Sequence, residues 1–407
     1  MQLHKCQNCD EVTTKIMSLG YMPPCNAMPK IGEPRRAQRW IPTDLMLCRS
    51  CDLVQLAYVE APTDVFPADY PYVSGSTKIL HDNFANLAKE APAIAGMNLG
   101  DLVVDIGSND GTLLSKFEGY RQLGIEPTDT ANIAISNHVP TIQQYFSVGL
   151  AKRVVSDYGA VKLVTCANCF AHIPDVHAVV DGVLELLAPD GVFVTESHYL
   201  MGLIERLQYD TIYQEHLRYY SLNSLTNILK RHGLNVFHAK HIPSHGGSIR
   251  VYASREARTV SASAKNLAAS ELRADALHAR LQTFARDVQA SRFALLERIA
   301  NAKRRGHQVV GLSAPSRGGT VVSYCGLDET MIDYVCEIVG SPKIGRYMPG
   351  TEIPVVDESR LFTDQPDYAI IFSWHIADEL IPKLRAKGYK GEFILPCNRE
   401  SDYAQAA

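Results

Sequence analysis

VVDIGSNDGTLL, residues 103–114, is the stretch that decides the fold class of this chain. A short apolar run ends at Asp105, and a loop with Gly107 and Gly111 follows before an amphipathic segment that starts at Thr112. A buried parallel strand, a tight turn and a helix N-terminus follow one another in this way where open α/β sheets bind ligands. Glycine lets the backbone turn sharply and approach a ligand closely. The stretch therefore predicts an α/β sheet with a ligand at this turn.

The glycine spacing indicates which ligand. It reads G-x-x-x-G after an acidic strand end, whereas dinucleotide sites read G-x-G-x-x-G. This difference favours the amino-acid end of S-adenosylmethionine over a pyrophosphate. Residues 123–126 predict a second strand ending in an acid, whose carboxylate can accept hydrogen bonds from two ribose hydroxyls. The expected cofactor-binding residues are Asp105, Gly107, Asn109, Gly111, Glu126 and Asn168.

The rest of this region alternates between strand and helix patterns. A helix over 77–91, capped by Ser74 or Ser76, precedes the glycine loop. Further strands are predicted at 141–144, 161–167 and 192–195, helices at 131–134, 149–158, 176–187 and 221–232, and a closing hairpin at 235–241 and 248–254. Alternating β and α elements with a terminal antiparallel pair fit the seven-stranded sheet of methyltransferases.

Two C-x-x-C pairs lie near the start of the chain. Each pair presents two thiolates on a tight turn, and two such turns can close a tetrahedral four-sulfur shell around Zn²⁺. Four thiolates leave no position for water, so we predict a structural zinc ribbon. Its ligands are Cys6, Cys9, Cys48 and Cys51. Cys166 and Cys169 repeat the spacing without a second pair nearby, and we interpret them as core or pocket-lining residues.

Length and composition bound the class of protein. A chain of 407 residues is too long for one core, and we expect domains at 1–68, 69–260 and 261–407. A net charge of −4 argues against nucleic-acid binding, and no apolar run reaches the roughly 20 residues of a membrane helix. The N-terminus lacks a signal peptide, and ten cysteines in a long chain suit a reducing cytoplasm. The oligomeric state is not fixed by these features; we expect a monomer.

Groups suited to proton transfer gather after the fifth strand, in YDTIYQEHLRYY, residues 209–220. Methylation of carbon needs a base that removes a proton next to a carbonyl and a donor that stabilises the enolate. His216 can take the proton, Glu215 can orient or assist it, and Tyr213 can donate to the oxyanion. His172, on the loop after strand 161–167, borders the same region.

The C-terminal third predicts a second α/β domain. A helix or helix pair over 262–302 leads to strands at 308–313, 334–339, 368–372 and 393–395. Arg317 and Gly318, at a predicted helix start, suggest an anion site suited to a pyrophosphate. The glycine turn of the closing hairpin, with His245, Gly247, Ser248 and Arg250, is expected to hold the substrate in the same cleft. Both could equally be ordinary tight turns.

Several motifs together resemble one family. CxxC…CxxC, VDIGSNDGTLL, ANCFAHIP, YQEHLRYYS, HGGSIRVY and GLSAPSRGGT are similar, in this order, to the deoxysugar C-methyltransferases. The resemblance implies a zinc ribbon, a class I (Rossmann-like) methyltransferase core and a C-terminal Rossmann-like domain. It implies transfer of a methyl group from S-adenosylmethionine to C3 of a nucleotide-linked 4-keto-6-deoxysugar.

The resemblance also implies residue roles. Tyr213, Glu215 and His216 would be catalytic, with His216 removing the proton α to the ketone, and Tyr72 and His172 would line the sugar pocket. From the residues alone, the tyrosines of segment 69–76 either form a lid or merely pack, and packing is the favoured interpretation. Two alternatives stay open: methylation of a sugar oxygen or nitrogen or another small metabolite, and a zinc-ribbon binding module with a degenerate core.

Overall fold

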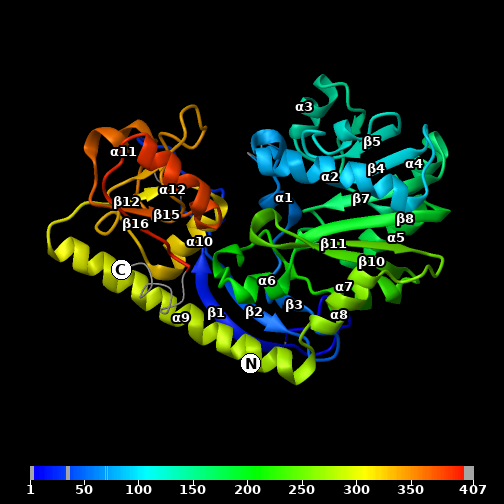
Figure 1. Cartoon of the computed structure of the whole chain (residues 1–407), viewed down its shortest axis with the longest axis horizontal. Helices are drawn as coiled ribbons and strands as arrows, with labels where there is room; N and C mark the ends of the chain where they lie inside the picture. The colour runs from blue at the N-terminus through cyan, green and yellow to red at the C-terminus, as the bar shows by residue number, and fades with distance from the viewer. Residues whose placement is uncertain (1–3, 34–36, 69, 71, 398–407) are drawn as a thin grey trace.

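A computed structural model describes residues 4–33, 37–68, 70 and 72–397. Figure 1 shows two α/β bodies, with the seven-stranded sheet on the right and the C-terminal sheet on the left. A small N-terminal sheet lies below and between them, and the long helix α9 (Ala274–Arg304) runs along the lower edge. The arrangement confirms the predicted fold class, in which two α/β sheets accompany a small cysteine module.

The N-terminal sheet is antiparallel with strand order β1-β2-β3-β9. Its strands are β1 (Thr14–Met22), β2 (Ile41–Leu47), β3 (Val54–Leu56) and β9 (Arg218–Tyr219). β9 comes from the predicted central domain, where Arg218 and Tyr219 pair with Gln55 and Val54. The N-terminal module is thereby joined to the chain segment directly after His216.

The central sheet has the order β10-β11-β8-β7-β4-β5-β6. Its strands are β4 (Leu102–Ile106), β5 (Arg121–Ile125), β6 (Thr141–Ile142), β7 (Val161–Ala167), β8 (Leu187–His198), β10 (Asn235–Ile242) and β11 (Ser248–Ser254). Five strands are parallel, and β11 and β10 complete the sheet in antiparallel register. The predicted seven-stranded sheet with its closing hairpin is confirmed.

Helices and 3₁₀ turns surround this sheet. They are α1 (Pro62–Val65), η1 (Ser74–Ser76), α2 (Lys78–Ala95), η2 (Leu114–Lys116), α3 (Thr130–Ser136), α4 (Val148–Tyr158), α5 (Val176–Leu186), α6 (Leu200–Glu205), η3 (Tyr209–Thr211), α7 (Leu222–Arg231) and η4 (Ser244–Gly246). Ser221 caps α7 with a capping box, and Gly233 follows its end at a φ of 78°.

One predicted helix is wrong. The segment from Thr112 forms only the 3₁₀ turn η2, because β5 begins at Arg121 and leaves too few residues for a crossover helix. α2 takes its place on the sheet, and its Leu80 and Phe84 belong to the same apolar cluster as Leu114. Ser74 does not cap α2, which starts after Thr77 without a side-chain cap. The side chain of Ser76 lies outside the described part.

The C-terminal sheet is fully parallel, with order β14-β13-β12-β15-β16. Its elements are β12 (Val309–Leu312), α10 (Ser316–Cys325), β13 (Val335–Glu337), β14 (Val355–Asp357), α11 (Ser359–Asp364), β15 (Tyr368–Ile371), η5 (Trp374–Ile376), α12 (Ala377–Ala386) and β16 (Glu392–Ile394). This is the predicted second α/β domain. The sequence analysis did not predict β14.

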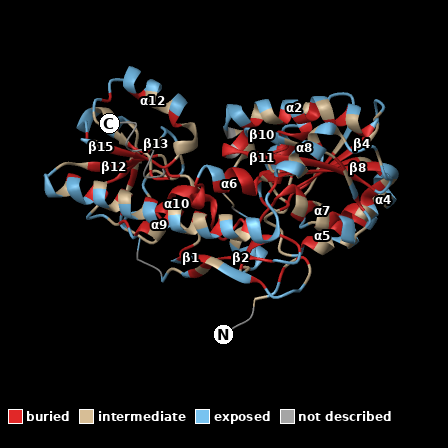
Figure 2. Cartoon of the chain, turned by 60° about the horizontal axis from the view of Figure 1, so that its bottom comes forward, coloured by how far each residue is buried: buried red, intermediate tan, exposed pale blue. Residues whose placement is uncertain are grey.

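The linking segment is a pair, α8 (Ala262–Ser270) and α9. α9 buries one face, with Leu277, Leu281, Phe284 and Val288 at the spacing of an amphipathic helix. Its residues belong to a core cluster that runs from the N-terminal module to the C-terminal sheet. Figure 2 shows buried strands inside helices with exposed outer faces. Among the described residues, no helix has the length and apolar character needed to cross a membrane.

Candidate functional site

The carboxyl ends of β4, β5 and β7 open onto a cavity of about 440 Å³. Gly107, Asn109, Glu126 and Asn168 all line it, together with Cys169 and His172. β4 lies between β5 and β7, so the cavity sits where the strand order reverses, the usual ligand position in an open α/β sheet. We call it the cofactor cavity.

The glycine loop is shaped for close approach. Gly107 has a φ of 73°, and a Cβ there would lie 2.4 Å from the Cys169 sulfur, so only glycine fits. Glu126 accepts from the Asn109 N–H at 2.9 Å and from the Thr128 N–H at 2.9 Å. The Asn168 side-chain oxygen is buried without a hydrogen-bond partner among the described groups. The Asn168 oxygen suits the amino-acid part of S-adenosylmethionine, and the Glu126 carboxylate at the end of β5 suits its ribose.

Two of the expected cofactor residues lie behind the loop. Asp105 accepts from the Thr165 hydroxyl at 2.7 Å, and burial raises the pKa of its carboxyl to about 8. Gly111, at a φ of 78°, packs against Val139 and Ala134 and is not part of the cavity wall. Neither residue lines the cofactor cavity, and direct contact of Asp105 and Gly111 with the cofactor stays a prediction.

The tyrosine-rich linker is attached to this loop. The Ser74 N–H donates to Asn109 Oδ1 at 2.8 Å, and Asn109 Nδ2 donates to the Tyr72 carbonyl at 3.0 Å. Tyr70, Tyr72 and Ser74 all line the cofactor cavity. Packing was the favoured interpretation, but the linker forms part of the cavity wall.

A column of aromatic rings leads from the cofactor cavity to His216. Phe66 stacks on His172 with ring centroids 5.6 Å apart, and His172 stacks on His216 at 5.0 Å and 18°. His198, at the end of β8, lies 5.0 Å from the His216 ring. The structure thus brings together His172 and His216, which are 44 positions apart.

The hydrogen bonds of His216 define its tautomer. Its Nδ1 lies 2.7 Å from the Thr211 carbonyl oxygen, and because a carbonyl only accepts, Nδ1 carries the hydrogen. Its Nε2 lies 3.2 Å from the Tyr213 hydroxyl. Burial raises the pKa of Tyr213 well above its ordinary value, so it remains a hydrogen-bond donor. The His216 ring is thus held between the Thr211 carbonyl at Nδ1 and the Tyr213 hydroxyl at Nε2.

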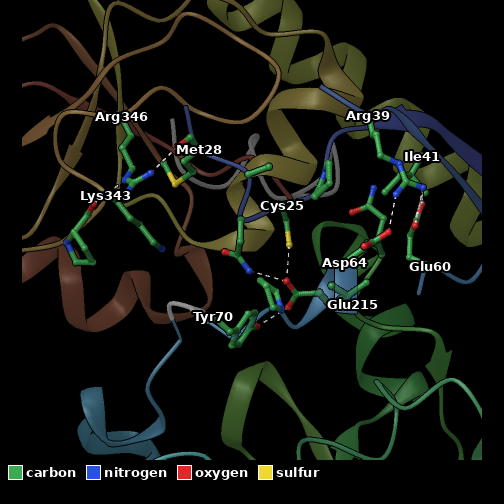
Figure 3. Close-up of a pocket in the computed structure, with 17 residues that line it drawn as sticks. Cys25, Met28, Arg39, Ile41, Glu60, Asp64, Tyr70, Glu215, Lys343 and Arg346 are labelled. Carbon is green, nitrogen blue, oxygen red and sulfur yellow. Dashed lines mark hydrogen bonds and ion pairs between the residues drawn. The ribbon is translucent and has the colours of Figure 1, made fainter. Parts of the chain in front are cut away.

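A second cavity of about 360 Å³ lies where three parts of the chain meet, and Figure 3 shows it. Glu215 reaches into it and accepts from Cys25 at 3.1 Å, Asn26 at 2.6 Å and Tyr70 at 2.9 Å. Burial raises the pKa of Glu215 although all three donors lower it. Because Tyr70 lines both cavities, they adjoin at its ring. We call this one the acceptor cavity.

The acceptor cavity also contains basic side chains. Lys343 Nζ donates to the Ala314 carbonyl at 2.7 Å, and Arg346 Nη1 donates to the Met28 carbonyl at 2.9 Å. Burial lowers the pKa of Lys343, while nearby carboxylates raise it. Arg39, in contrast, is occupied by Glu60 at 2.9 Å and by Asp64. Lys343 and Arg346 are the cations best placed to meet an anionic ligand here.

The predicted anion site at Arg317 and Gly318 is corrected. Arg317 Nε and Nη2 bind the two oxygens of Asp210 at 2.6 and 2.8 Å, and both side chains are buried. A Cβ on Gly318 would lie 3.1 Å from Phe372, so this glycine allows close packing of α10 on the sheet. Neither residue lines the cofactor or acceptor cavity.

The glycine turn of the closing hairpin is likewise corrected as a substrate site. Arg250 is fully buried and pairs with Glu196 at 2.6 Å and Glu90 at 2.5 Å, which ties α2 to the sheet. Ser248 is also fully buried, and Gly247 accepts from the Tyr199 N–H at 3.1 Å. Of this turn, Gly247, Ser248 and Arg250 line neither the cofactor cavity nor the acceptor cavity. The side chain of His245 lies outside the described part, so its role stays a prediction.

The four predicted metal ligands converge. The sulfur atoms of Cys6, Cys9, Cys48 and Cys51 all lie within 4.8 Å of one another. Cys6 and Cys51, and Cys9 and Cys48, are each 3.5 Å apart. A compact four-sulfur cluster is the donor set and the geometry that a structural Zn²⁺ requires.

Several site residues were missed. Cys25 and Asn26 sit in a loop of the N-terminal module, and Lys343 sits in a turn of the C-terminal domain. Tyr70 belonged to the aromatic segment that the sequence analysis noted, but Tyr72 was chosen instead. His198 follows the predicted strand at 192–195 and could have been found as a polar residue at a strand end. For Cys25 and Lys343 the sequence offers no comparable signal.

Three family models match successive parts of the chain. A zinc binding domain matches residues 6–66, a methyltransferase domain matches 79–239, and a C-methyltransferase C-terminal domain matches 243–397. The chain is 34% identical over 362 residues to the C-methyltransferase NovU of Streptomyces niveus, and the match covers 87% of this chain and 86% of that one.

Solved structures resemble part of the chain. The PH0226 protein of Pyrococcus horikoshii OT3 is 14% identical and has a TM-score of 0.37, covering 49% of this chain and 100% of its own. An S-adenosylmethionine-dependent methyltransferase of Clostridium acetobutylicum is 11% identical and has a TM-score of 0.35, covering 45% of this chain and 94% of its own.

Proposed function

The chain belongs to the family of S-adenosylmethionine-dependent C-methyltransferases, and we propose that it methylates carbon C3 of a nucleotide-linked 4-keto-6-deoxysugar. The single observation that carries this proposal is the position of His216. Its ring stands in the ring column next to the cofactor cavity, with Nδ1 directed at the Thr211 carbonyl, while its neighbour Glu215 reaches into the acceptor cavity.

The cofactor cavity would hold the methyl donor. Gly107 and Asn109 would meet the amino-acid part, and Glu126 would accept from the ribose hydroxyls. When bound, S-adenosylmethionine supplies an electrophilic methyl group on a sulfonium. The contribution of the chain to such a displacement is alignment of the two partners and exclusion of water.

His216 would act as the base. Its Nε2 would take the proton from the carbon next to the ketone, and the electron pair left on that carbon would form the new bond to the methyl group. The Nδ1–H bond to Thr211 would stabilise the imidazolium that forms. Tyr213, whose hydroxyl lies 3.2 Å from Nε2, would donate to the developing oxyanion when the substrate enters.

The acceptor cavity would hold the nucleotide sugar. Lys343 and Arg346 supply positive charge suited to a diphosphate, in place of the Arg317 site predicted from the sequence. Glu215, already held by Cys25, Asn26 and Tyr70, has acceptor capacity for a sugar hydroxyl. Because Tyr70 borders both cavities, the sugar end would lie against the methyl donor.

The test is a transfer assay with a thymidine diphosphate-linked 4-keto-6-deoxysugar and donor carrying a ¹³C-methyl group. We expect a ¹³C signal of a methyl group bonded to carbon, at C3 of the sugar. A methyl signal on oxygen or nitrogen would instead support the alternative function, methylation of a heteroatom on a sugar or another small metabolite.

A further inference from the structure

The starting observation is a buried carboxylate that serves no ligand. Asp210 in η3 has no exposed surface, and both of its oxygens are taken by the C-terminal domain. Arg317 binds it in a two-pronged pair, and the Trp374 indole N–H donates to Oδ2 at 2.7 Å. The Arg317 guanidinium also lies 5.2 Å from the centre of the Trp374 ring. Three donors on one buried carboxylate hold it in a single position.

Asp210 directly precedes the residue that sets the His216 tautomer. The Thr211 carbonyl accepts from His216 Nδ1 at 2.7 Å, so its direction decides which ring nitrogen is free. Thr211 also donates through its N–H and its hydroxyl to the Gln208 carbonyl, at 3.1 and 2.8 Å. The turn 208–211 is therefore one rigid unit.

That unit is held from two sides. On one side, Gln208 Nε2 donates to the Gly246 carbonyl of the hairpin turn at 2.7 Å. On the other side, Arg317 and Trp374 hold Asp210. The first attachment lies within the central domain, whereas the second comes from elements more than 100 positions further along the chain. Only the second depends on how the C-terminal domain is seated.

We propose that Arg317 and Trp374 are positioning residues for His216: by fixing Asp210, they direct the Thr211 carbonyl at Nδ1, so that Nε2 is the ring nitrogen that takes the proton. This inference rests on the proposed role of His216 as base. It gives the C-terminal domain a part in proton transfer in addition to substrate binding, and it explains why Arg317 is occupied instead of offering an anion site.

The test reads the tautomer directly and needs no sugar. Protein labelled with ¹⁵N-histidine is studied by NMR at pH 8 with S-adenosylhomocysteine, and His216→Asn identifies the His216 signals by their loss. In the unmodified protein we expect a protonated Nδ1 and a bare Nε2. Trp374→Phe removes one donor to Asp210 and keeps a ring, and Arg317→Lys keeps the charge but not the two-pronged pair.

Both variants should move the His216 nitrogen shifts toward a mixture of tautomers. Turnover should fall by about tenfold or more, as when the partner that orients a functional histidine is lost, with the dissociation constant for S-adenosylhomocysteine unchanged. The matched control is Tyr209→Phe, which removes the hydroxyl facing the Pro396 carbonyl from the same turn without touching Asp210. Its tautomer signals should stay as in the unmodified protein.

Two outcomes overturn the inference. One is unchanged His216 shifts in both Trp374→Phe and Arg317→Lys. The other is an equal change in Tyr209→Phe, which would mean that any loosening of the contact between these domains has the same effect. If the chain instead methylates another substrate, the tautomer result still stands, so failure of the proposed function is distinguishable.

Discussion

The chemical properties of His216, Glu215 and Asp105 depend on the groups that surround them. His216 is oriented by one backbone carbonyl at its Nδ1, and Glu215 is held by three donors from two other segments of the chain. Asp105 is a carboxyl whose pKa burial raises to about 8. Each is a polar group in an apolar site, where its protonation state depends on a few neighbours.

Asp105 should make stability depend on pH. Its folded pKa of about 8 lies above the ordinary value of 3.8, so the folded protein holds a proton that the unfolded chain releases. Raising the pH from about 4 to about 8 therefore favours unfolding, by up to about 1.4 kcal/mol per pH unit. In Asp105→Asn this contribution is absent. We expect its melting temperature to rise relative to the unmodified protein as the pH increases from 5 to 8.

The control is Asp157→Asn, which changes an exposed carboxyl on α4. Its melting temperature should differ from that of the unmodified protein by the same amount at every pH. A constant difference for Asp105→Asn as well would show that Asp105 is ionised throughout this range.

Loss of the Lys343 charge should weaken binding of the nucleotide sugar and leave cofactor binding unchanged. Lys343→Met keeps most of the side-chain length and removes the charge from the acceptor cavity. We expect KM for the nucleotide sugar to rise about tenfold, the size of one charge-assisted contact, with unchanged affinity for S-adenosylhomocysteine. Steady-state kinetics and calorimetry measure the two. An unchanged KM would remove Lys343 from the substrate site.

At the scale of elements, the site depends on short segments that cross between sheets. β9 places two residues of the central domain in the N-terminal sheet, and the linker 72–75 is bonded to the glycine loop. Asn109 joins that linker to the cofactor cavity in a left-handed conformation with a φ of 50°. These crossings join the cofactor loop to the linker that forms part of its cavity wall.

Asn109→Gly tests this connection. Glycine accepts the positive φ without strain and removes both side-chain bonds to the linker. Losing two hydrogen bonds of about 1 kcal/mol each should weaken S-adenosylhomocysteine binding by roughly tenfold, and trypsin should cut faster at Lys78. Asn132→Gly, on the exposed side of α3, is the control for a glycine elsewhere in the domain. Unchanged affinity and cleavage would mean that the linker does not cover the cofactor.

At the scale of the whole molecule, all three sheets contribute to the acceptor cavity. Cys25 and Asn26 come from the N-terminal module, Glu215 from the central domain and Lys343 from the C-terminal domain. By contrast, the described residues that line the cofactor cavity all fall within 62–179. Donor binding and acceptor binding should therefore respond differently when one domain is disturbed.

Zinc removal should impair methyl transfer much more than cofactor binding. Without the four-cysteine cluster, the sheet that carries Cys25 and pairs with β9 loses its anchor. We expect a chelator-treated protein, with its zinc content measured by mass spectrometry, to lose most of its methyl transfer. Its affinity for S-adenosylhomocysteine should fall no more than a fewfold, and zinc should restore transfer. Full turnover without zinc would contradict a structural role for the module.

Local patterns predicted most of the fold, and they failed where distant segments decide the structure. Strand 161–167 and the closing hairpin were predicted closely, because apolar runs and alternation report burial directly. The helix after the glycine loop was wrong because α2 covers its place. β14 is too short for a pattern, and β9 exists only because β3 lies beside it.

For the site residues too, local patterns failed where the partner lies far away along the chain. Motifs that mark strand ends predicted Gly107 and Glu126, which line the cofactor cavity, and a local cluster of polar residues predicted His216, which stands beside it. Arg317 was misassigned because its partner Asp210 lies 107 positions away, and no local pattern reveals that a charge is already paired. Lys343 was missed for the corresponding reason: its cavity is formed by three separate parts of the chain.

Proton removal by His216 is the central claim, and solvent exchange tests it most directly. The protein is incubated in D₂O with the keto-sugar nucleotide and S-adenosylhomocysteine, which permits deprotonation but no transfer, and NMR follows deuterium at the carbon next to the ketone. We predict deuterium incorporation with the unmodified protein, and at least a hundredfold slower incorporation with His216→Asn, which still binds S-adenosylhomocysteine. Equal incorporation rates in the two proteins would contradict the assignment of His216 as the base.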